Sequence, residues 1–300
     1  MPEVVVAVIT AYSPGPRLVD LVRSLTPQVG RVIVVDDGSP AGAGETRQAL
    51  ADAEEAGATV VRHGSNRGIA AALNTGIAAA RAVEGARHVV TFDQDSSVED
   101  GLVGALLSTR DAARGAGIPA GLAAPERVAG LPDLTVRSQR GILVGRTPIQ
   151  SGLLVPFDTL DRIGGFAEEL FIDGVDTDFA LRAAGAGLAV VHARGTELGH
   201  SLGSGHEVTV LGRPLSLTHS APFRYYYLLR NRVLLNRRRH RYAGYRAGRE
   251  TLADLRHLAV VTLFVPGRGR RLRAALAGLR DGWAGRTGRI PAAVEARLRG

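Results

Sequence analysis

The sequence predicts an α/β protein with a mostly parallel, doubly wound sheet and a helical C-terminal extension. Three observations carry this prediction. Strand and helix patterns alternate strictly from residue 4 to residue 116, the strand patterns are unbroken apolar runs, and residues 221–300 have helical spacing. Strict alternation is typical of parallel strands joined by helices. Unbroken apolar runs are typical of strands covered on both faces.

The first elements follow from their residue types. Residues 4–10 form an apolar strand, and residues 17–25 repeat leucine and valine at helical spacing. Residues 31–35 form a second apolar strand, which ends at an Asp-Asp-Gly turn. Residues 45–56 form a helix that Gly57 stops, since glycine commonly follows the last turn of a helix.

The same pattern then repeats. Residues 58–62 form a third strand, and a Ser-Asn-Arg-Gly loop leads into a helix of small residues at 69–82. Residues 88–92 form a fourth apolar strand, and residues 102–116 form the next helix. Parallel strands end at one edge of the sheet, so the loops after these strands should lie together.

Beyond residue 119 the composition changes. Residues 120–215 are richer in glycine and proline and hold shorter strands, at 141–144, 152–155 and 189–193. The expected domains are a body of residues 1–220, with halves 1–118 and 119–220, and a basic helical region of residues 221–300.

The charge is unevenly distributed. All 37 basic residues are arginine, and residues 221–300 hold 19 of them against four acidic residues. This region carries a net charge of +15, so residues 1–220 carry −7 of the total of +8. A region this basic suits nucleic acid, anionic lipid or phosphate groups, and it equally suits a solvated helical surface.

Several classes of protein are disfavoured. The chain has no cysteine, which excludes disulfides and thiol chemistry. It has no Gly-x-Gly-x-x-Gly after the first strand and no Walker A motif, which disfavours a dinucleotide fold and a P-loop ATPase. Residues 11–15 lack the glycine-rich basic loop expected of a nucleotidyltransferase. The chain also lacks the zinc-finger and RNP patterns that are typical of nucleic-acid-binding proteins.

The N-terminus lacks a basic segment followed by a long apolar segment, so it does not resemble a signal peptide. No apolar stretch reaches the about 20 residues that span a bilayer. We therefore expect a cytoplasmic protein, or one that is peripheral on the inner face of the cell membrane.

Asp93 and Asp95 follow the fourth strand directly. At that position their carboxylates would project into the crevice where open α/β sheets bind ligands. Mg²⁺ and Mn²⁺ favour carboxylate oxygens and often bind through one or two of them together with substrate phosphates. The pattern therefore predicts a divalent metal site. The alternative is a solvated turn, in which aspartate is also common.

Other polar residues should meet this crevice. Asp36 and Asp37 end the second strand, where a carboxylate can accept a hydrogen bond from N3–H of uracil or thymine. Residues 66–68 (Asn66, Arg67 and Gly68) open a helix that also holds Asn74. Side-chain donors and the N–H groups of a helix N-terminus favour a phosphate or a ribose oxygen.

Two later segments add candidates for chemistry. Asp173, Asp176 and Asp178 lie within six residues of one another, which exceeds the needs of helix capping, and one of them could act as a general base on an acceptor hydroxyl. His200 follows another predicted strand and could close a metal site with Asp93 and Asp95.

Together these segments resemble the inverting family 2 glycosyltransferases of GT-A fold, and among them the branch that uses dTDP-L-rhamnose. The matching segments follow the expected order over residues 4 to 235, and the Phe-Asp-Gln-Asp-Ser and Phe-Ile-Asp-x-Val-Asp versions point to the rhamnosyl branch. The matching segments are 34–39, 66–76, 92–96, 151–152, 171–178, 200–203 and 224–231.

The resemblance implies a role for each segment. Thr10, Ala11 and Tyr12 would line the base pocket, with Asp36 or Asp37 reading the base. Residues 66–68, Asn74 and Gln94 would belong to the nucleotide site. Asp93 and Asp95 would hold Mg²⁺ or Mn²⁺ on the donor diphosphate, and His200 would complete that site. Asp176 takes the place of the catalytic base, with Asp173 and Asp178 as alternatives, since many relatives have Glu-Asp where this chain has Val175-Asp176.

The resemblance also implies the partners. The donor would be a dTDP- or UDP-linked sugar, and the acceptor a glycan or a polyprenyl-linked glycan in cell-surface polysaccharide synthesis. The alternatives are a galactofuranosyl- or other hexosyltransferase that uses a UDP-sugar and, further off, an arginine-rich nucleic-acid-binding protein. Residues 221–300 would lie on an anionic membrane surface or pack as a lid on the body.

Overall fold

The computed structural model describes residues 4–40, 42, 44–130, 137–145, 148–199, 204–210, 213–238, 242 and 245–299. The chain forms two compact units. One holds residues 1–168 and 176–201, and the other holds residues 169–175 and 202–300. We call them the N-terminal unit and the C-terminal unit. The sequence led us to expect a boundary between 220 and 221; in this division residues 202–220 and residues 169–175 fall in the C-terminal unit.

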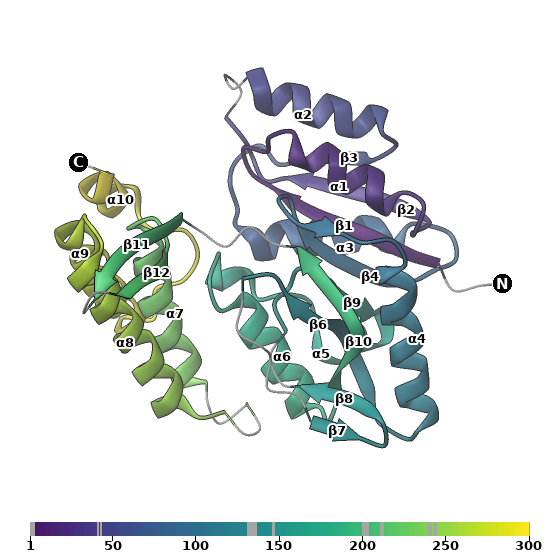
Figure 1. The fold of residues 1–300 in the computed structure, drawn as a ribbon. Helices are drawn as coiled ribbons and strands as arrows, with labels where there is room; N and C mark the ends of the chain where they lie inside the picture. The colour runs from purple at the N-terminus through teal and green to yellow at the C-terminus, as the bar shows by residue number, and fades with distance from the viewer. Residues whose placement is uncertain are drawn as a thin grey trace. The chain divides into compact units, whose positions relative to one another are not determined.

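The N-terminal unit alternates strands and helices over its first half, and residues 120–156 then hold four strands in succession (Figure 1). Its strands are β1 (Val4–Ala11), β2 (Arg31–Asp36), β3 (Thr59–Arg62), β4 (Ala86–Asp93), β5 (Ser97–Val98), β6 (Ala120–Val128), β7 (Arg137–Gln139), β8 (Ile142–Gly145), β9 (Leu153–Pro156) and β10 (Ala189–Gly199). Its helices are α1 (Arg17–Leu25), α2 (Gly44–Glu55), α3 (Ile69–Arg81), α4 (Leu102–Gly115), α5 (Phe157–Ile163) and α6 (Val175–Gly185), and a short 3₁₀ turn covers Glu168–Leu170.

The strands form one sheet in the order β3-β2-β1-β4-β9-β6-β10-β8-β7, with β5 beside β10. The first four strands pair in parallel, which confirms the doubly wound prediction for this half. Strand β9 then enters antiparallel to β4, while β6 and β10 pair in parallel. The second half of the sheet is therefore mixed.

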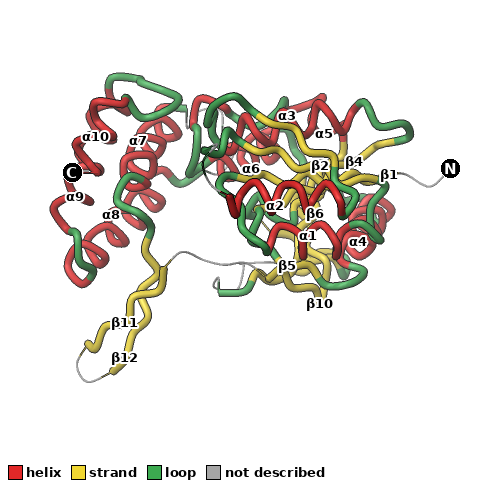
Figure 2. The backbone as a smooth tube through the Cα atoms, turned by 90° about the horizontal axis from the view of Figure 1, so that it is seen from above, coloured by secondary structure: helices red, strands yellow, loops and turns green. Residues whose placement is uncertain are grey.

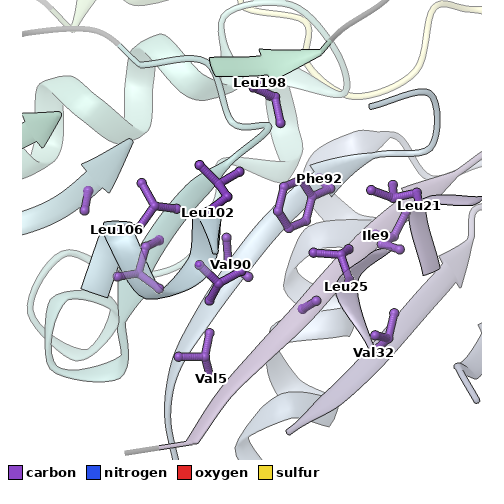
Figure 3. Packing of buried hydrophobic residues seen from close by; sticks show 14 of the residues in the cluster. Val5, Ile9, Leu21, Leu25, Val32, Val90, Phe92, Leu102, Leu106 and Leu198 are labelled. Atoms are coloured by element: carbon purple, nitrogen blue, oxygen red, sulfur yellow. The ribbon is translucent and has the colours of Figure 1, made fainter. Parts of the chain in front are cut away.

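Helices cover both faces of the sheet, with α1, α2 and α4 on one side and α3 on the other (Figure 2). The core lies between β1 and β4 and the helices α1 and α4 (Figure 3). Its larger side chains are almost fully buried; they include Ile9, Leu21, Leu25, Val90, Phe92, Leu102 and Leu106. This packing fixes the carboxyl ends of β1 and β4 next to each other.

The C-terminal unit is mostly helical, as the sequence predicts. It holds α7 (Arg224–Arg237), α8 (Ala247–Phe264), α9 (Arg268–Trp283) and α10 (Ala292–Arg299), together with a hairpin of β11 (Ser204–Val210) and β12 (Arg213–His219). Tyr225, Tyr226 and Tyr227 of α7 are buried in its core. In the described part of the chain, no helix combines the length and the apolar character needed to cross a membrane.

The core of the C-terminal unit also contains charge. Arg230 is fully buried, and its guanidinium carbon lies 4.9 Å from the centroid of the Tyr227 ring. Burial raises the pKa of both Tyr226 and Tyr227 to about 12, so each phenol keeps its proton. Each phenol also makes a hydrogen bond: Tyr226 donates to Asp281 at 2.9 Å, and Tyr227 accepts from the Ile290 N–H at 2.8 Å.

Candidate active site

The carboxyl ends of β1, β2 and β4 bring the first candidate residues together. Thr10 is in register with Val35 of β2 and with Asp93 of β4, and Ala11 is in register with Asp36. Neighbouring strands lie about 4.8 Å apart. Thr10 and Asp93 therefore share one level, and Asp36 lies one residue further along, at the sheet edge where ligands of open α/β sheets bind.

Asp36 joins the loops that follow β1 and β2. Its Oδ1 accepts hydrogen bonds from the Ser39 amide at 3.2 Å and from the Ser39 hydroxyl at 2.5 Å. The same hydroxyl oxygen accepts the Ser13 N–H at 2.7 Å. The Oδ2 atom of Asp36 takes no hydrogen bond from the residues that the structure describes, so it can accept one from a ligand.

Asp37 has a different environment. Its Oδ1 bonds His63 Nδ1 at 2.8 Å and accepts the Arg67 amide at 2.9 Å, while Oδ2 accepts the Gly68 amide at 2.7 Å. Both oxygens are thus engaged by the protein. Asp37 holds the loop in front of α3 in place, and Asp36 is the better candidate to read a nucleotide base.

Gly38 follows Asp36 and Asp37, and a side chain at this position would clash with the loop that holds Ser65. Its φ is +71°, in the region that favours glycine. A Cβ atom at Gly38 would lie 2.3 Å from the Ser65 carbonyl carbon. The Asp-Asp-Gly turn and the loop before α3 therefore pack directly against each other.

Gln94 ties the loop after β4 to the loop after β1. Its Oε1 accepts the Tyr12 N–H at 2.7 Å, and its Nε2 donates to the Tyr12 carbonyl at 3.2 Å. The Tyr12 ring is 46% exposed. The pairing fixes the backbone of Tyr12 and leaves its ring available to stack on a planar ligand.

Asp93 is held by the segment before β9. The Ser151 hydroxyl accepts the Asp93 N–H at 3.1 Å and bonds the Ser96 hydroxyl at 2.7 Å. The side-chain amide of Gln150 donates to Asp93 Oδ1. Asp95 lies in the turn that follows, between Asp93 and the buried Ser96.

The donor set at this turn suits a divalent cation. Asp93 and Asp95 supply hard carboxylate oxygens, which Mg²⁺ and Mn²⁺ prefer. His200, the third predicted ligand, lies outside the described residues. Within the described residues no group of three His, Cys, Asp or Glu side chains forms a cage, so phosphate oxygens or water would complete the coordination.

The loop before α3 supplies further candidates. Asn66 Oδ1 accepts the Gly68 N–H at 3.2 Å, and the Arg67 guanidinium reaches Glu168 at 3.5 Å, with both side chains about half exposed. Asn74, in contrast, is engaged at both ends of its amide. It donates to the Phe166 carbonyl and to Glu168, and it accepts the Phe166 N–H at 2.8 Å. Asn74 therefore fixes the segment that precedes the aspartate cluster.

The three aspartates of that cluster differ in their partners. Asp173 forms a two-point ion pair with Arg224 of α7. Asp178 is 2% exposed and accepts from Arg182 at 2.8 Å, and Arg182 also donates to the carbonyls of residues 163–165. Asp176, in the first turn of α6, accepts the Thr177 amide at 2.7 Å. Arginine thus holds the carboxylates of Asp173 and Asp178.

The segment before α6 adopts an uncommon backbone. Phe171 has φ +65° and Asp173 has φ +63°, which is rare for residues other than glycine. Asn231 of α7 holds this segment, because its amide donates to the carbonyls of Leu170, Ile172 and Asp173 at 2.7–2.9 Å. Its own oxygen accepts from Arg230, which also donates to the Leu170 carbonyl.

The sequence did not single out His63 or Gln150, and for the pair Arg230-Asn231 it suggested no role. His63 follows β3 directly, and Gln150 precedes the Ser151-Gly152 pair. The signal that the sequence offered for each residue was therefore its position next to a predicted strand or a matched segment. Their roles depend on contacts with residues 26 to 61 positions away in the chain. Spacing within one motif does not reveal such contacts.

Two solved structures share the fold of this chain. S. aureus TarS 1-349 has a TM-score of 0.50 and 16% identity, covering 97% of this chain and 82% of that one. GalNAc-T7, solved with UDP, GalNAc and Mn²⁺, has a TM-score of 0.53 and 11% identity, covering 66% of this chain and 44% of that one. The chain has the GT-A fold, an α/β fold with a mostly parallel central sheet.

The sequence comparisons are more specific. The model of the family described as Glycosyl transferase family 2 matches residues 6–117. The chain is similar to a dTDP-rhamnosyl transferase, RfbF of Shigella flexneri, with 30% identity over 251 residues, which cover 78% of this chain and 80% of that protein. The chain belongs to glycosyl transferase family 2.

Proposed function

We propose that this enzyme transfers L-rhamnose from dTDP-L-rhamnose, with inversion, to a glycan or lipid-linked glycan in the synthesis of a cell-surface polysaccharide. The similarity to a dTDP-rhamnosyl transferase over 78% of the chain supports the donor. The single structural observation that carries the chemistry is that Thr10, Asp36 and Asp93 end neighbouring parallel strands at one sheet edge.

In this proposal the nucleotide binds across the ends of β1 and β2. The open oxygen of Asp36 accepts N3–H of thymine, and the exposed Tyr12 ring stacks on the base. Thr10 and Ala11 form the floor of the pocket, because they end β1 between the two loops. Asn66, Arg67 and Gly68 face the ribose and phosphates with amide and guanidinium donors.

Asp93 and Asp95 would hold Mg²⁺ or Mn²⁺ against the donor diphosphate, with His200 as a further ligand. A cation there would neutralise the charge that develops on the departing diphosphate. GalNAc-T7, which shares the fold, was solved with Mn²⁺. The protein holds Asp93 in place, because Gln150 donates to its carboxylate and Ser151 accepts its N–H.

Inverting transfer is a single in-line displacement, so a base must take the proton of the acceptor hydroxyl on the face opposite the leaving group. We assign this role to Asp176. The support is its position, which matches that of the catalytic base in the family that the chain resembles. Asp173 and Asp178, the alternatives, each form an ion pair with an arginine. General base assistance typically contributes about 10²–10⁴-fold.

The test is turnover by Asp176→Asn with a panel of sugar nucleotides, read as released nucleotide diphosphate with metal and EDTA controls. We expect dTDP release by the wild type, a loss of at least about 10²-fold in the variant, and unchanged affinity for dTDP. Asp178→Asn is the matched control for a structural aspartate. It should lower the stability of the protein, and turnover should fall only together with stability. Near-normal turnover by Asp176→Asn would remove the assignment.

The panel also separates the alternative donor. A galactofuranosyl- or other hexosyltransferase would release UDP, and UDP would then displace dTDP in a competition experiment. The carboxylate of Asp36 accepts N3–H from uracil and thymine alike, so the choice between them depends on contacts around the thymine methyl group.

We also propose that the C-terminal unit lies on an anionic membrane. Large apolar side chains are exposed on α8 and α9, and both helices also carry exposed arginines. The exposed apolar residues, which we call the apolar face, are Leu252, Leu255, Leu263, Phe264, Leu272, Leu276 and Trp283. Apolar residues bordered by arginine suit a helix in the interface of an anionic bilayer.

A further inference from the structure

We propose that Gln150 is a positioning residue, which orients the Asp93 carboxylate for the cation and the donor diphosphate. The inference rests on the proposed function, because it assigns a purpose to a side chain that touches Asp93. Neither the sequence motifs nor packing alone explains a glutamine at this position.

The first observation is the contact itself. The Gln150 amide nitrogen donates to Asp93 Oδ1, and the next residue, Ser151, accepts the Asp93 N–H at 3.1 Å. Two neighbouring side chains thus hold both the backbone and the carboxylate of Asp93. Groups of this kind, which orient a metal ligand, typically change metal affinity or activity 10- to 100-fold when they are removed.

The second observation is that Gln150 is itself fixed. It is 6% exposed, and its backbone carbonyl accepts the hydroxyl of the buried Thr91 on β4. Two residues further on, the Gly152 N–H donates to the Thr91 carbonyl at 2.7 Å. Because its backbone is attached to the strand that carries Asp93, Gln150 has little freedom to move relative to that carboxylate.

The third observation is an unsatisfied atom. Gln150 Oε1 is buried and has no hydrogen-bond partner among the described residues. A buried acceptor without a donor destabilises the fold, and such groups are rare in native proteins. Turning the amide over would place Oε1 against Asp93 Oδ1, where two acceptors repel. The orientation of the amide is therefore set by Asp93.

These observations separate a positioning role from a packing role. A methionine would fill nearly the same volume without leaving a buried oxygen unpaired. The glutamine gives up that stability and gains a directed hydrogen bond to one carboxylate oxygen. Unpaired polar groups and strained conformations gather at functional sites for this reason.

The experiment compares wild type with Gln150→Met by isothermal titration with dTDP, and in parallel with UDP, in Mn²⁺ and in EDTA. We expect the variant to lose about 10- to 100-fold in nucleotide affinity in Mn²⁺, to keep its affinity in EDTA, and to show an unfolding temperature no lower than wild type. Gln139→Met, the same change at an exposed residue of β7, should alter neither measurement.

A double-mutant cycle gives a second readout. In an Asp93→Asn background, Gln150→Met should cause no further loss of Mn²⁺-dependent affinity, because the two residues act through one contact. Equal affinity of Gln150→Met and wild type in Mn²⁺ would overturn the inference while leaving the proposed function intact. A lower unfolding temperature with equal losses in Mn²⁺ and EDTA would assign Gln150 a structural role instead. Absence of nucleotide binding by the wild type would overturn both.

Discussion

At the scale of single residues, His192 shows how burial sets a pH limit on the fold. Its ring is 1% exposed on β10, Nδ1 contacts the Pro125 carbonyl at 2.8 Å, and Nε2 has no partner among the described residues. Burial is the largest influence and lowers the pKa of His192 from 6.5, against a smaller opposing effect of the Pro125 carbonyl. The folded protein therefore keeps this ring neutral.

The sign of the pH dependence follows. The unfolded chain takes up a proton at pH 6.5, and the folded chain does so only at lower pH, so stability is complete above pH 6.5 and falls as the pH drops below it. We expect His192→Asn, which can still donate to the Pro125 carbonyl, to reduce the slope of unfolding free energy below pH 6.5 by up to about 1.4 kcal/mol per pH unit. Urea titrations at several pH values measure it, and an unchanged slope would contradict the assignment.

The two adjacent aspartates show what a sequence leaves open at this scale. The sequence does not distinguish Asp36 from Asp37, and both were candidates to bind the nucleotide base. The structure distinguishes them, because three groups from residues 63–68 engage both oxygens of Asp37. Such a difference depends on which loop folds against the strand end, which local spacing does not encode.

At the scale of elements, α7 supports the segment before α6. Asn231 donates to three carbonyls there, and the segment contains Phe171 and Asp173 with positive φ. Because its carbonyls point toward α7, the backbone of residues 170–173 has a defined path. Asp176 follows three residues later in the chain.

We expect Asn231→Ala to leave these carbonyls without donors and to destabilise the protein by at least about 2 kcal/mol. Turnover should fall by more than stability explains, while affinity for dTDP should be unchanged, since the proposed nucleotide site lies in the N-terminal unit. Denaturation and calorimetry measure the two effects. Asn236→Ala, the same change on the same helix, is the control; turnover reduced equally in both variants would argue against a positioning role.

The element boundaries show where sequence patterns were sufficient. Helix α1 covers Arg17–Leu25 as predicted, because its apolar spacing is strong and local. Strand β6 was not predicted, and Pro125 within it explains why. Proline cannot donate to a ladder and argues against a central strand. The structure accommodates it beside a register shift of β10 between Ala193 and Glu197, where ladder pairing is already interrupted.

At the scale of the whole molecule, the uneven charge and the apolar face predict where the enzyme works. We expect it to bind vesicles that contain anionic lipid at low salt and to be released by high salt. Leu276→Ser with Trp283→Ser should weaken binding by at least about 10-fold, because both side chains are mostly exposed and would otherwise enter the interface. Flotation measures it.

The matched control for this prediction is Leu279→Ser, on the same helix but partly buried, which should lower stability without removing a lipid contact. Turnover with a soluble acceptor should be unchanged in the double variant. Absence of flotation by the wild type at low salt would exclude the membrane, and a dimer that dissociates in the double variant would assign the face to a second copy instead. Arginine counts alone predicted a basic surface, but only the folded helices reveal which leucines are exposed.

Residues 169–175 belong to the C-terminal unit, although the residues on either side of them belong to the N-terminal unit. The chain therefore passes between the two units more than once, and no single cut separates them. A chimera made by exchanging the C-terminal regions of two such enzymes at residue 201 would separate residues 169–175 from α7, which binds their carbonyls. A working chimera would have to take residues 169–175 and α7 from the same enzyme.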